Sequence, residues 1–125
     1  MPTLNRKNRN VDDYIVGYVD GEGCFSVSFS VRHKLLIGWE TKPSFSVGQN
    51  HYRSELLYIM QERLRCGYMR RDFSDQTLKY EVRRLDDLIT KVIPFFDQHS
   101  LLSGKQKDFI LFRQVCFMMR DQAHL

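Results

Sequence analysis

A carboxylate flanked by two glycines is the feature of this chain best suited to chemistry. Glu22 stands between Gly21 and Gly23 at the end of the segment 15–23. The apolar spacing before Glu22 predicts a helix, which the glycines would end. The last carbonyls of a helix have no intrahelical partners, so a carboxylate beside them suits a hard divalent cation. The same spacing also fits a glycine-rich helix end that carries a solvated acid.

The predicted helix has one face without large side chains. Gly17 and Gly21 are four residues apart and share this face with Asp13, one turn earlier. A glycine inside a helix costs about 1 kcal/mol relative to alanine, so two of them require a reason. A bare face allows a second helix backbone to approach closely. Either Asn10 or Asp12 is expected to cap the start of the helix.

The segment 15–23 resembles the signature that names the LAGLIDADG homing endonucleases. The identical positions are Gly17, Asp20 and Gly23, the conservative replacements are Ile15, Val19, Gly21 and Glu22, and the looser ones are Val16 and Tyr18. The resemblance extends along the chain from about Val11 to Phe112. In that family the second acid of the motif binds the catalytic metal. The resemblance therefore implies a metal site at Glu22 with Gly21, filled by Mg²⁺ or another divalent cation such as Mn²⁺.

Two further segments resemble the family at its catalytic positions. Gln49 matches a glutamine that often lies near the scissile phosphates, and Arg53 follows where some members have a basic residue. Lys105 matches the lysine that opens the last helix in the catalytic site, although Lys107 is close enough to be confused with it. The resemblance implies that Glu22, Gln49 and Lys105 are catalytic. From the residues alone, Gln49 equally suits a cap of the following helix, and Lys105 suits a solvated helix start.

Composition favours one globular domain with a polyanionic partner. The 125 residues are 42% hydrophobic, and 19 Lys and Arg against 15 Asp and Glu leave a net charge of +4. We expect residues 1–10 to form a basic flexible arm and residues 11–125 to form the domain. The isolated Cys24, Cys66 and Cys116 support neither a disulfide framework nor a zinc site. With no leader and no long apolar run, we expect an intracellular protein without a membrane, in a bacterial cytoplasm or an organelle.

Hydrophobic periodicity predicts the elements that position these residues. Alternation over 25–32 and 39–48 predicts two strands, and 54–65 has the spacing of a helix. A second strand pair at 67–72 and 77–84 is followed by helices at 86–96 and 104–120. The order αββαββα predicts an α+β fold with one antiparallel four-stranded sheet, helices on one face and the other face open.

The open face of the predicted sheet carries short hydroxyls and long cations. These side chains donate to phosphates and base edges, and a sheet can enter the major groove of DNA. The residues expected there are Ser26, Ser28, Ser30, Arg32, Lys42, Ser44, Arg70, Lys79 and Arg83, with Arg53 added by the resemblance. An ordinary solvated sheet face has the same pattern. Alternation also leaves the register of the fourth strand open, because a bulge would turn Leu78, Tyr80 and Val82 outward.

The resemblance implies a homodimeric, metal-dependent endonuclease that cuts double-stranded DNA at a long pseudo-palindromic site, such as one linked to an intron. Family members with one motif dimerise through the motif helices, which brings two acids together. The interface residues implied are Asp13, Gly17, Asp20 and Gly21. One alternative is an intron RNA maturase or a catalytically inactive DNA-binding protein on the same scaffold. A second is a basic α+β interaction module that binds no nucleic acid.

Overall fold

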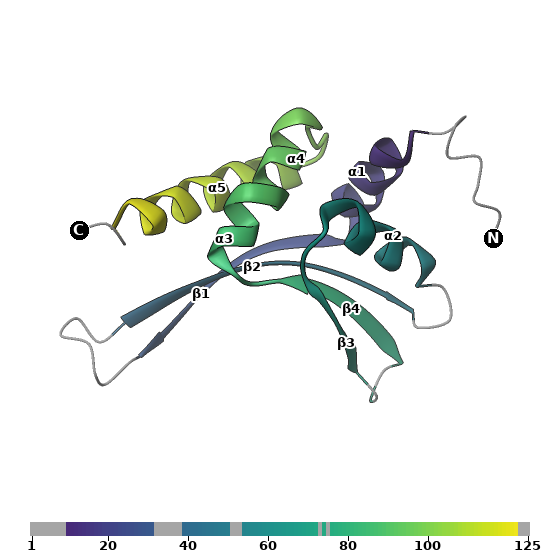
Figure 1. Ribbon diagram of the computed structural model, residues 1–125, viewed down its shortest axis with the longest axis horizontal. Helices are drawn as coiled ribbons and strands as arrows, with labels where there is room; N and C mark the ends of the chain where they lie inside the picture. Colours follow the sequence, from purple (N-terminus) through teal and green to yellow (C-terminus); the bar gives the residue numbers. More distant parts are fainter. Residues whose placement is uncertain (1–9, 32–38, 51–53, 73, 75, 123–125) are drawn as a thin grey trace.

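The computed structural model describes residues 10–31, 39–50, 54–72, 74 and 76–122. The predicted basic arm before Asn10, Arg32 and Arg53 lie outside these residues, as does the side chain of Ser30. The elements in chain order are α1 (Val11–Glu22), β1 (Gly23–Val31), β2 (Trp39–Asn50), α2 (Glu55–Leu64), β3 (Tyr68–Asp72), β4 (Thr77–Val82), α3 (Leu85–Asp87), the π-helical turn η2 (Leu88–Val92), α4 (Ile93–Gln98) and α5 (Lys105–Gln122) (Figure 1).

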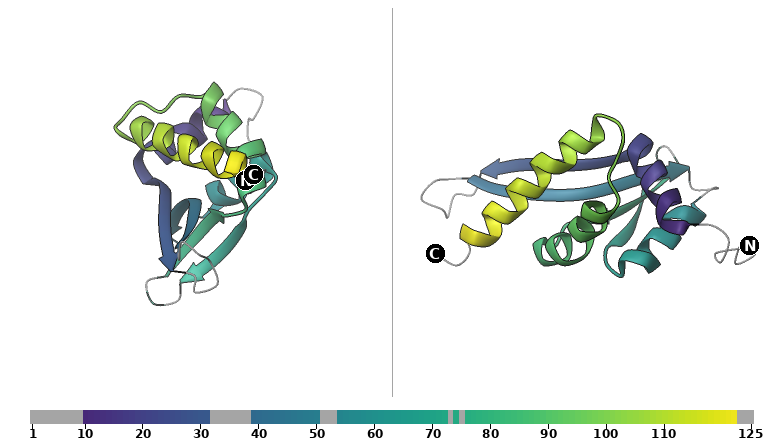
Figure 2. Two further views of the ribbon diagram at one scale, coloured as in Figure 1. Left: turned by 90° about the vertical axis from the view of Figure 1, so that its left-hand side faces the viewer. Right: turned by 90° about the horizontal axis from the view of Figure 1, so that it is seen from above.

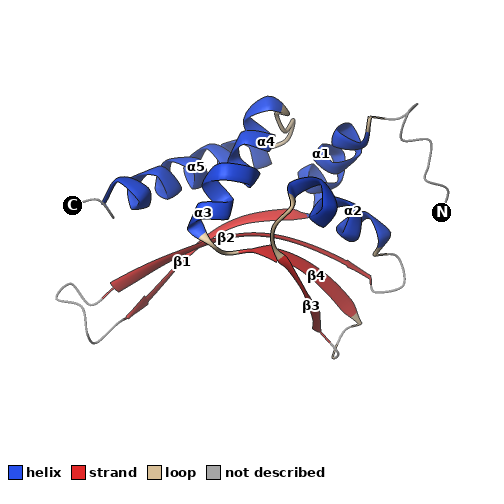
Figure 3. Ribbon diagram, viewed as in Figure 1, coloured by secondary structure: helices blue, strands red, loops and turns tan. Residues whose placement is uncertain are grey.

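The strands form one antiparallel sheet of four strands in the order β1-β2-β4-β3. The helices all lie on one side of this curved sheet, and the other side is uncovered (Figure 3). Seen from above, α5 runs across β1 and β2 while α1 and α2 lie over the opposite end of the sheet (Figure 2). The predicted α+β architecture is confirmed.

Aromatic side chains join the sheet to the helices. Phe25 of β1 has its ring centroid 5.2 Å from that of Phe45 in β2 and 5.3 Å from that of Phe112 in α5. In β4, Leu78, Tyr80 and Val82 are buried with this core. The fourth strand therefore has no outward-facing apolar row, and the bulged alternative is wrong. Since side chains alternate along a strand, the intervening residues of β4 belong to the open face.

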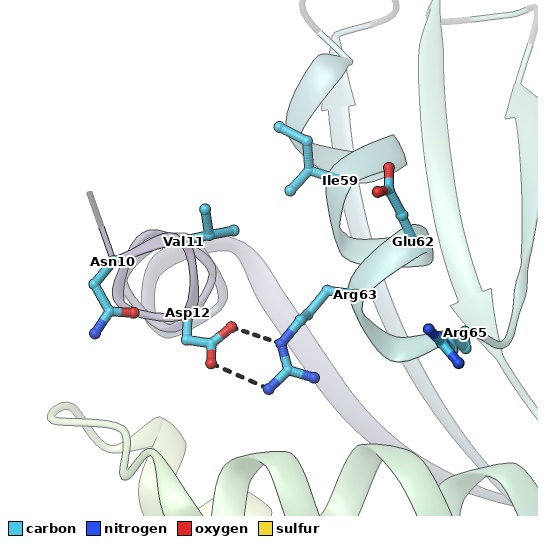
Figure 4. A pocket seen from close by; sticks show the side chains of 7 residues that line it. All are labelled: Asn10, Val11, Asp12, Ile59, Glu62, Arg63 and Arg65. Carbon is cyan, nitrogen blue, oxygen red and sulfur yellow. Dashed lines mark hydrogen bonds and ion pairs between the residues drawn. The ribbon is translucent and has the colours of Figure 1, made fainter. Parts of the chain in front are cut away.

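The start of α1 is fixed by two different side chains. Asn10 Oδ1 accepts a hydrogen bond from the Asp13 N–H at 3.2 Å, so Asn10 and not Asp12 is the cap. Asp12 instead accepts two hydrogen bonds from Arg63 of α2, at 2.8 and 3.1 Å. This pair lies in an open pocket between α1 and α2, where the charges neutralise each other (Figure 4). We assign no chemistry to that pocket.

At its C-terminus, α1 continues directly into β1. Gly23 is extended (φ −78°, ψ 163°), and its N–H donates to the Val19 carbonyl. A Cβ at Gly23 would lie 2.6 Å from Val19 Cγ1 and 2.9 Å from the Val19 oxygen, so a side chain there would force the helix away from the strand. Glycine is required here by close approach, and Glu22 is thereby held as the last residue of α1.

The third predicted helix differs from the prediction of one regular helix over 86–96. The observed helical stretch is longer and consists of α3, η2 and α4. Pro94 occupies the first turn of α4 and has no N–H for a helical hydrogen bond, so the wider turn just before it accommodates a break in the regular pattern. The predicted strand 77–84 also ends earlier, at Val82, which leaves Arg83 immediately beyond β4.

Candidate functional site

The carboxylate predicted to bind metal lies exposed at the end of α1. Glu22 and Gly21 are both exposed at the last two positions of α1. Within the part of the chain that the structure describes, no group of three or more His, Cys, Asp or Glu could hold a metal ion. Hard oxygen donors fit Mg²⁺ or Mn²⁺, but one chain supplies only part of a coordination shell.

Lys105 reaches this helix end from the first turn of α5. Its Nζ donates a hydrogen bond to the Gly23 carbonyl at 2.5 Å, across 82 positions of sequence. Lys107 lies two residues further along α5 and is exposed. Successive helical residues point about 100° apart, so the two lysines project in very different directions. It is Lys105 that the fold brings to the end of α1, one residue from Glu22.

The approach of α5 to α1 is held by a hydrogen-bonded clamp. Asp20 Oδ1 accepts from the Ser103 N–H at 3.0 Å and from Ser103 Oγ at 2.7 Å. Ser103 Oγ in turn accepts from the Lys105 N–H at 3.1 Å, in the first turn of α5. The hydrogen bond from the Ser103 hydroxyl is the main reason that the pKa of Asp20 is lowered from its ordinary value. Asp20, which the resemblance assigns to an interface, thus has a clear role within its own chain.

Tyr18 ties α1 to the end of β2, where Gln49 lies. The Tyr18 hydroxyl donates to the Gly48 carbonyl at 2.8 Å. Burial, followed by the negative charge of Glu22, raises the pKa of Tyr18, so it remains a donor at neutral pH. Gln49 Oε1 is buried and accepts no hydrogen bond from the described residues. The alternative in which this oxygen caps α2 is therefore wrong.

The open face of the sheet carries most of the predicted polar residues in register. Ser26 lies opposite Ser44 and Ser28 opposite Lys42, and the Ser28 hydroxyl donates to the Lys42 carbonyl at 3.4 Å. Across the other strand pair, Arg70 lies opposite Lys79. For Ser30 the structure gives only the backbone position, opposite Glu40, because its side chain is not described. The described members of the predicted set thus come from all four strands, with Arg83 just beyond the end of β4.

Glu81 is the polar residue of this face that the sequence interpretation missed. It is only 2% exposed, and it accepts hydrogen bonds from Tyr68 Oη (3.3 Å), Arg70 Nε (2.8 Å) and Arg83 Nε (2.9 Å). Arg70 and Arg83 were predicted as separate cations, whereas the structure shows them sharing one carboxylate. The signal in the sequence was an acid at an outward position between Lys79 and Arg83, where a polar face otherwise gathers cations.

The glycine face of α1 is open in this chain. Gly17 and Gly21 are exposed, and a Cβ built at either would meet no described atom within 4 Å. Asp13 and Tyr14 at the start of the helix are exposed as well, whereas Ile15 and Val19 on the opposite side are buried. The bare face predicted from the spacing exists, and nothing among the described residues packs on it.

A family model described as "LAGLIDADG endonuclease" matches residues 15–116 of this sequence. The chain belongs to the LAGLIDADG endonuclease family. The match includes the motif helix, the whole sheet and the start of α5, so the family resemblance predicted from the motif is confirmed. No helix in the described part of this LAGLIDADG protein is long and apolar enough to cross a membrane.

Several curated relatives of this LAGLIDADG chain are named as probable intron-encoded endonucleases. A probable intron-encoded endonuclease Cox1-I1b of Schizosaccharomyces pombe is 34% identical over 111 residues, which cover 86% of this chain and 27% of that protein. The DNA endonuclease I-CeuI of Chlamydomonas moewusii is 25% identical, with coverage of 89% and 53%. The chain spans about a quarter of the length of the first curated relatives that it matches.

Solved structures share both the fold and part of the sequence. The homing endonuclease I-TnaI superposes with a TM-score of 0.83 at 34% identity, covering 90% of this chain and 76% of that one. The LAGLIDADG homing endonuclease I-LtrWI, solved bound to its target DNA, gives a TM-score of 0.87 at 30% identity, covering 91% of this chain and 39% of that one.

Proposed function

We propose that this chain is a site-specific DNA endonuclease that makes metal-dependent cuts in both strands of a long pseudo-palindromic site. The observation that carries the proposal is the hydrogen bond from Lys105 Nζ to the Gly23 carbonyl, which joins a cation to the helix end that carries Glu22. Fold likeness to a family member bound to target DNA supports the same substrate class. The combination of acid, cation and buried amide acceptor suits phosphodiester hydrolysis better than simple binding.

In the proposed reaction, each residue of the site has a different role. Glu22, with the Gly21 carbonyl, would hold Mg²⁺ or Mn²⁺, and such a metal supplies positive charge that activates water and stabilises the leaving oxygen. Lys105 stabilises negative charge as it develops on the phosphate, or polarises the attacking water. Gln49 offers its buried amide oxygen as an acceptor that orients a water molecule. The clamp between Asp20 and Ser103 keeps the lysine beside the acid.

A complete centre needs a second acid, which we propose comes from a second copy of the chain. The exposed face of Gly17 and Gly21, with Asp13 at its start, would pack against the same face of the partner. Two-fold symmetry then brings both Glu22 carboxylates to the axis, where each completes the oxygen set of the other. Asp20 borders this interface and acts mainly through its contact with Ser103.

The open sheet face is the proposed DNA surface. It has hydroxyls on β1 and β2 and cations on β2, β3 and β4, and the sheet that carries it is curved (Figure 3). A sheet can enter the major groove of DNA. We infer an intracellular location, in a bacterial cytoplasm or an organelle, because the substrate is DNA. The names of the curated relatives support an intron as the coding locus.

Cleavage of a randomised duplex library, followed by sequencing of the cut ends, tests the function. We expect one long site with mirrored half-sites, cut in both strands in Mg²⁺ or Mn²⁺ and intact in chelator. Salt-sensitive DNA binding with no cut ends in either metal would contradict the nuclease and favour an inactive DNA-binding protein. Activity restricted to intron RNA in a splicing assay would favour the maturase, and absence of nucleic-acid binding would favour the plain interaction module.

Lys105→Met is expected to slow cleavage about 100-fold at unchanged DNA affinity, because loss of one preorganised charge at the reacting group typically costs that much. Lys107→Met is the matched control, since it removes the same charge two residues away on the exposed side of α5. Single-turnover cleavage of the selected site measures both. If both variants lost the same fraction of the cleavage rate, the effect would come from the net charge of the protein and not from the position of Lys105.

Lys79→Ala is expected to alter base preference at one or two positions in each half-site, because Lys79 lies on a central strand of the sheet. A homodimer presents this strand twice, so any change must be mirrored about the cut. The lost contact should cost about 1 to 3 kcal/mol at the matched base. Binding to every single-base variant of the selected site measures this effect. A change confined to one half-site would contradict the symmetric dimer.

A further inference from the structure

A buried carboxylate joins two exposed arginines on the open face of the sheet. The Glu81 side chain is 3% exposed, whereas those of Arg70 and Arg83 are 54% and 62% exposed. Glu81 lies on β4, the strand between β2 and β3, opposite Ser46 of β2 and Tyr68 of β3. Arg70 is on the edge strand β3, and Arg83 lies just beyond the end of β4. Neither the proposed catalytic centre nor the proposed dimer contact uses this group.

The acceptor positions of Glu81 are filled from within the chain. Oε1 accepts from Arg70 Nε at 2.8 Å, and Oε2 accepts from Arg83 Nε at 2.9 Å and from Tyr68 Oη at 3.3 Å. The Glu81 carboxylate has almost no exposed surface and is already hydrogen-bonded, so it does not itself contact a DNA base. What the group presents outward is the two guanidinium ions.

The cluster of Glu81, Arg70 and Arg83 also has a net positive charge at the surface. Burial raises the pKa of Glu81, but the hydrogen bond from Arg70 and the charges of both arginines outweigh it, so the net pKa lies below its ordinary value. One negative charge held between two positive ones leaves a net charge of +1, and Lys79 lies directly opposite Arg70. The region therefore remains cationic, as a DNA-facing surface requires.

Fixing an arginine before binding makes it a better reader of bases. A free arginine side chain loses rotamer entropy when a ligand immobilises it, and a pre-formed ion pair has already removed part of that freedom. Its planar fork matches the O6 and N7 acceptors of guanine in the major groove. Arg83 bonds Glu81 through Nε, which leaves its terminal nitrogens outside the bonds that it makes to Glu81. Arg70 contacts Glu81 through Nε and also through Nη2, which lies 2.5 Å from Oε1, so Nη1 is the fork nitrogen outside that contact.

We infer that Glu81 is a positioning residue that holds Arg70 and Arg83 in fixed orientations for reading guanine in each half-site of the target DNA. The inference rests on the proposed function, since it assigns specificity to the same DNA surface.

The test compares Glu81→Gln with the wild type on every single-base variant of the selected site, at two salt concentrations. The substitution removes one negative charge and raises the net charge of the surface by one, so affinity for unrelated DNA should rise. Discrimination for guanine at the contacted positions should fall about tenfold in both half-sites, as expected when a bidentate contact is lost. Glu62→Gln, which removes the same charge from an exposed site on α2, should leave base preference unchanged.

Three further variants keep the inference open to refutation if Glu81→Gln folds poorly by circular dichroism. Glu81→Asp keeps the charge and shortens the reach, so it should lose discrimination without gaining affinity for unrelated DNA. Arg70→Ala and Arg83→Ala should each lose preference for guanine, and either one combined with Glu81→Gln should lose little more, because the contacts act as one unit.

If Glu81→Gln or Glu81→Asp kept the base preference of the wild type, the proposal that Glu81 positions the arginines would be overturned. If Arg70→Ala and Arg83→Ala weakened the affinity for all DNA sequences equally, the arginines would contact phosphates, and the proposal that they read guanine would be overturned. Failure of the proposed function is distinguishable from both, because the wild type itself would then select no site.

Discussion

Glu22→Gln is expected to abolish cleavage while the fold and DNA binding are retained. Glu22 is exposed at the last position of α1, so an amide of the same shape disturbs no packing. The amide lacks the negative charge that would bind the metal. A bound metal stabilises the transition state of phosphoryl transfer by several kcal/mol. A loss of about 4 kcal/mol corresponds to a chemical step that is about 1,000-fold slower. Single-turnover cleavage in Mg²⁺ and in Mn²⁺, with affinity measured separately, checks this result.

Glu62→Gln serves as the control for Glu22→Gln as well, because it makes the same chemical change at an exposed position of α2. It should cleave at the wild-type rate. Substantial cleavage by Glu22→Gln in either metal would remove Glu22 from the mechanism, and loss of DNA binding in the same variant would show that the acid has a structural role instead.

Gly17→Leu is expected to convert a dimer into a folded monomer that no longer cuts. A Cβ at this position meets no described atom of its own chain within 4 Å, and Gly17 is exposed, so the monomer should fold normally. In the proposed dimer, the added side chain would force the two motif helices apart. Overpacking costs about 1 to 3 kcal/mol per site, and two-fold symmetry repeats it, so about 2 to 6 kcal/mol of dimerisation free energy should be lost. Sedimentation and the dependence of cleavage on protein concentration measure the effect.

Gly104→Leu is the matched control for sedimentation, because a Cβ at Gly104 also meets no described atom within 4 Å and Gly104 lies outside α1. It should remain a dimer. A wild-type monomer whose cleavage is first order in protein would refute the homodimer, and the second acid would then have to come from elsewhere.

Local patterns in the sequence were enough to predict the helices and strands and the position of Glu22 at the end of its helix. Period-two alternation in β1 separates Phe25 and Val27, packed with the core, from Ser26 and Ser28 on the open face. Each of these signals acts over a few neighbouring residues, because strand and helix geometry repeat at fixed short periods. The four-stranded sheet with helices on one face, and Glu22 at the end of its helix, could therefore be predicted without coordinates. The same local signals failed at Pro94, where the turn η2 interrupts a helix predicted as regular.

Contacts between distant segments decided the rest. The family resemblance matches Lys105 best but leaves Lys107 close enough to be confused with it, and the packing of α5 against α1 is what brings Lys105 to the Gly23 carbonyl. The hydrogen bond between Asp20 and Ser103 spans a comparable separation and leaves no mark on local periodicity.

The sharing of Glu81 by Arg70 and Arg83 depends in the same way on the register of β3 against β4. Alternation assigns each of these side chains to the open face but does not say which of them meet. A one-residue slip would turn every side chain of a strand to the other face, and burial of Leu78, Tyr80 and Val82 against the helices excludes it. The sequence by itself thus determined which faces exist and which residues belong to them, whereas the tertiary structure decided which charges lie together, because ion pairs form between segments that only the folded core brings into contact.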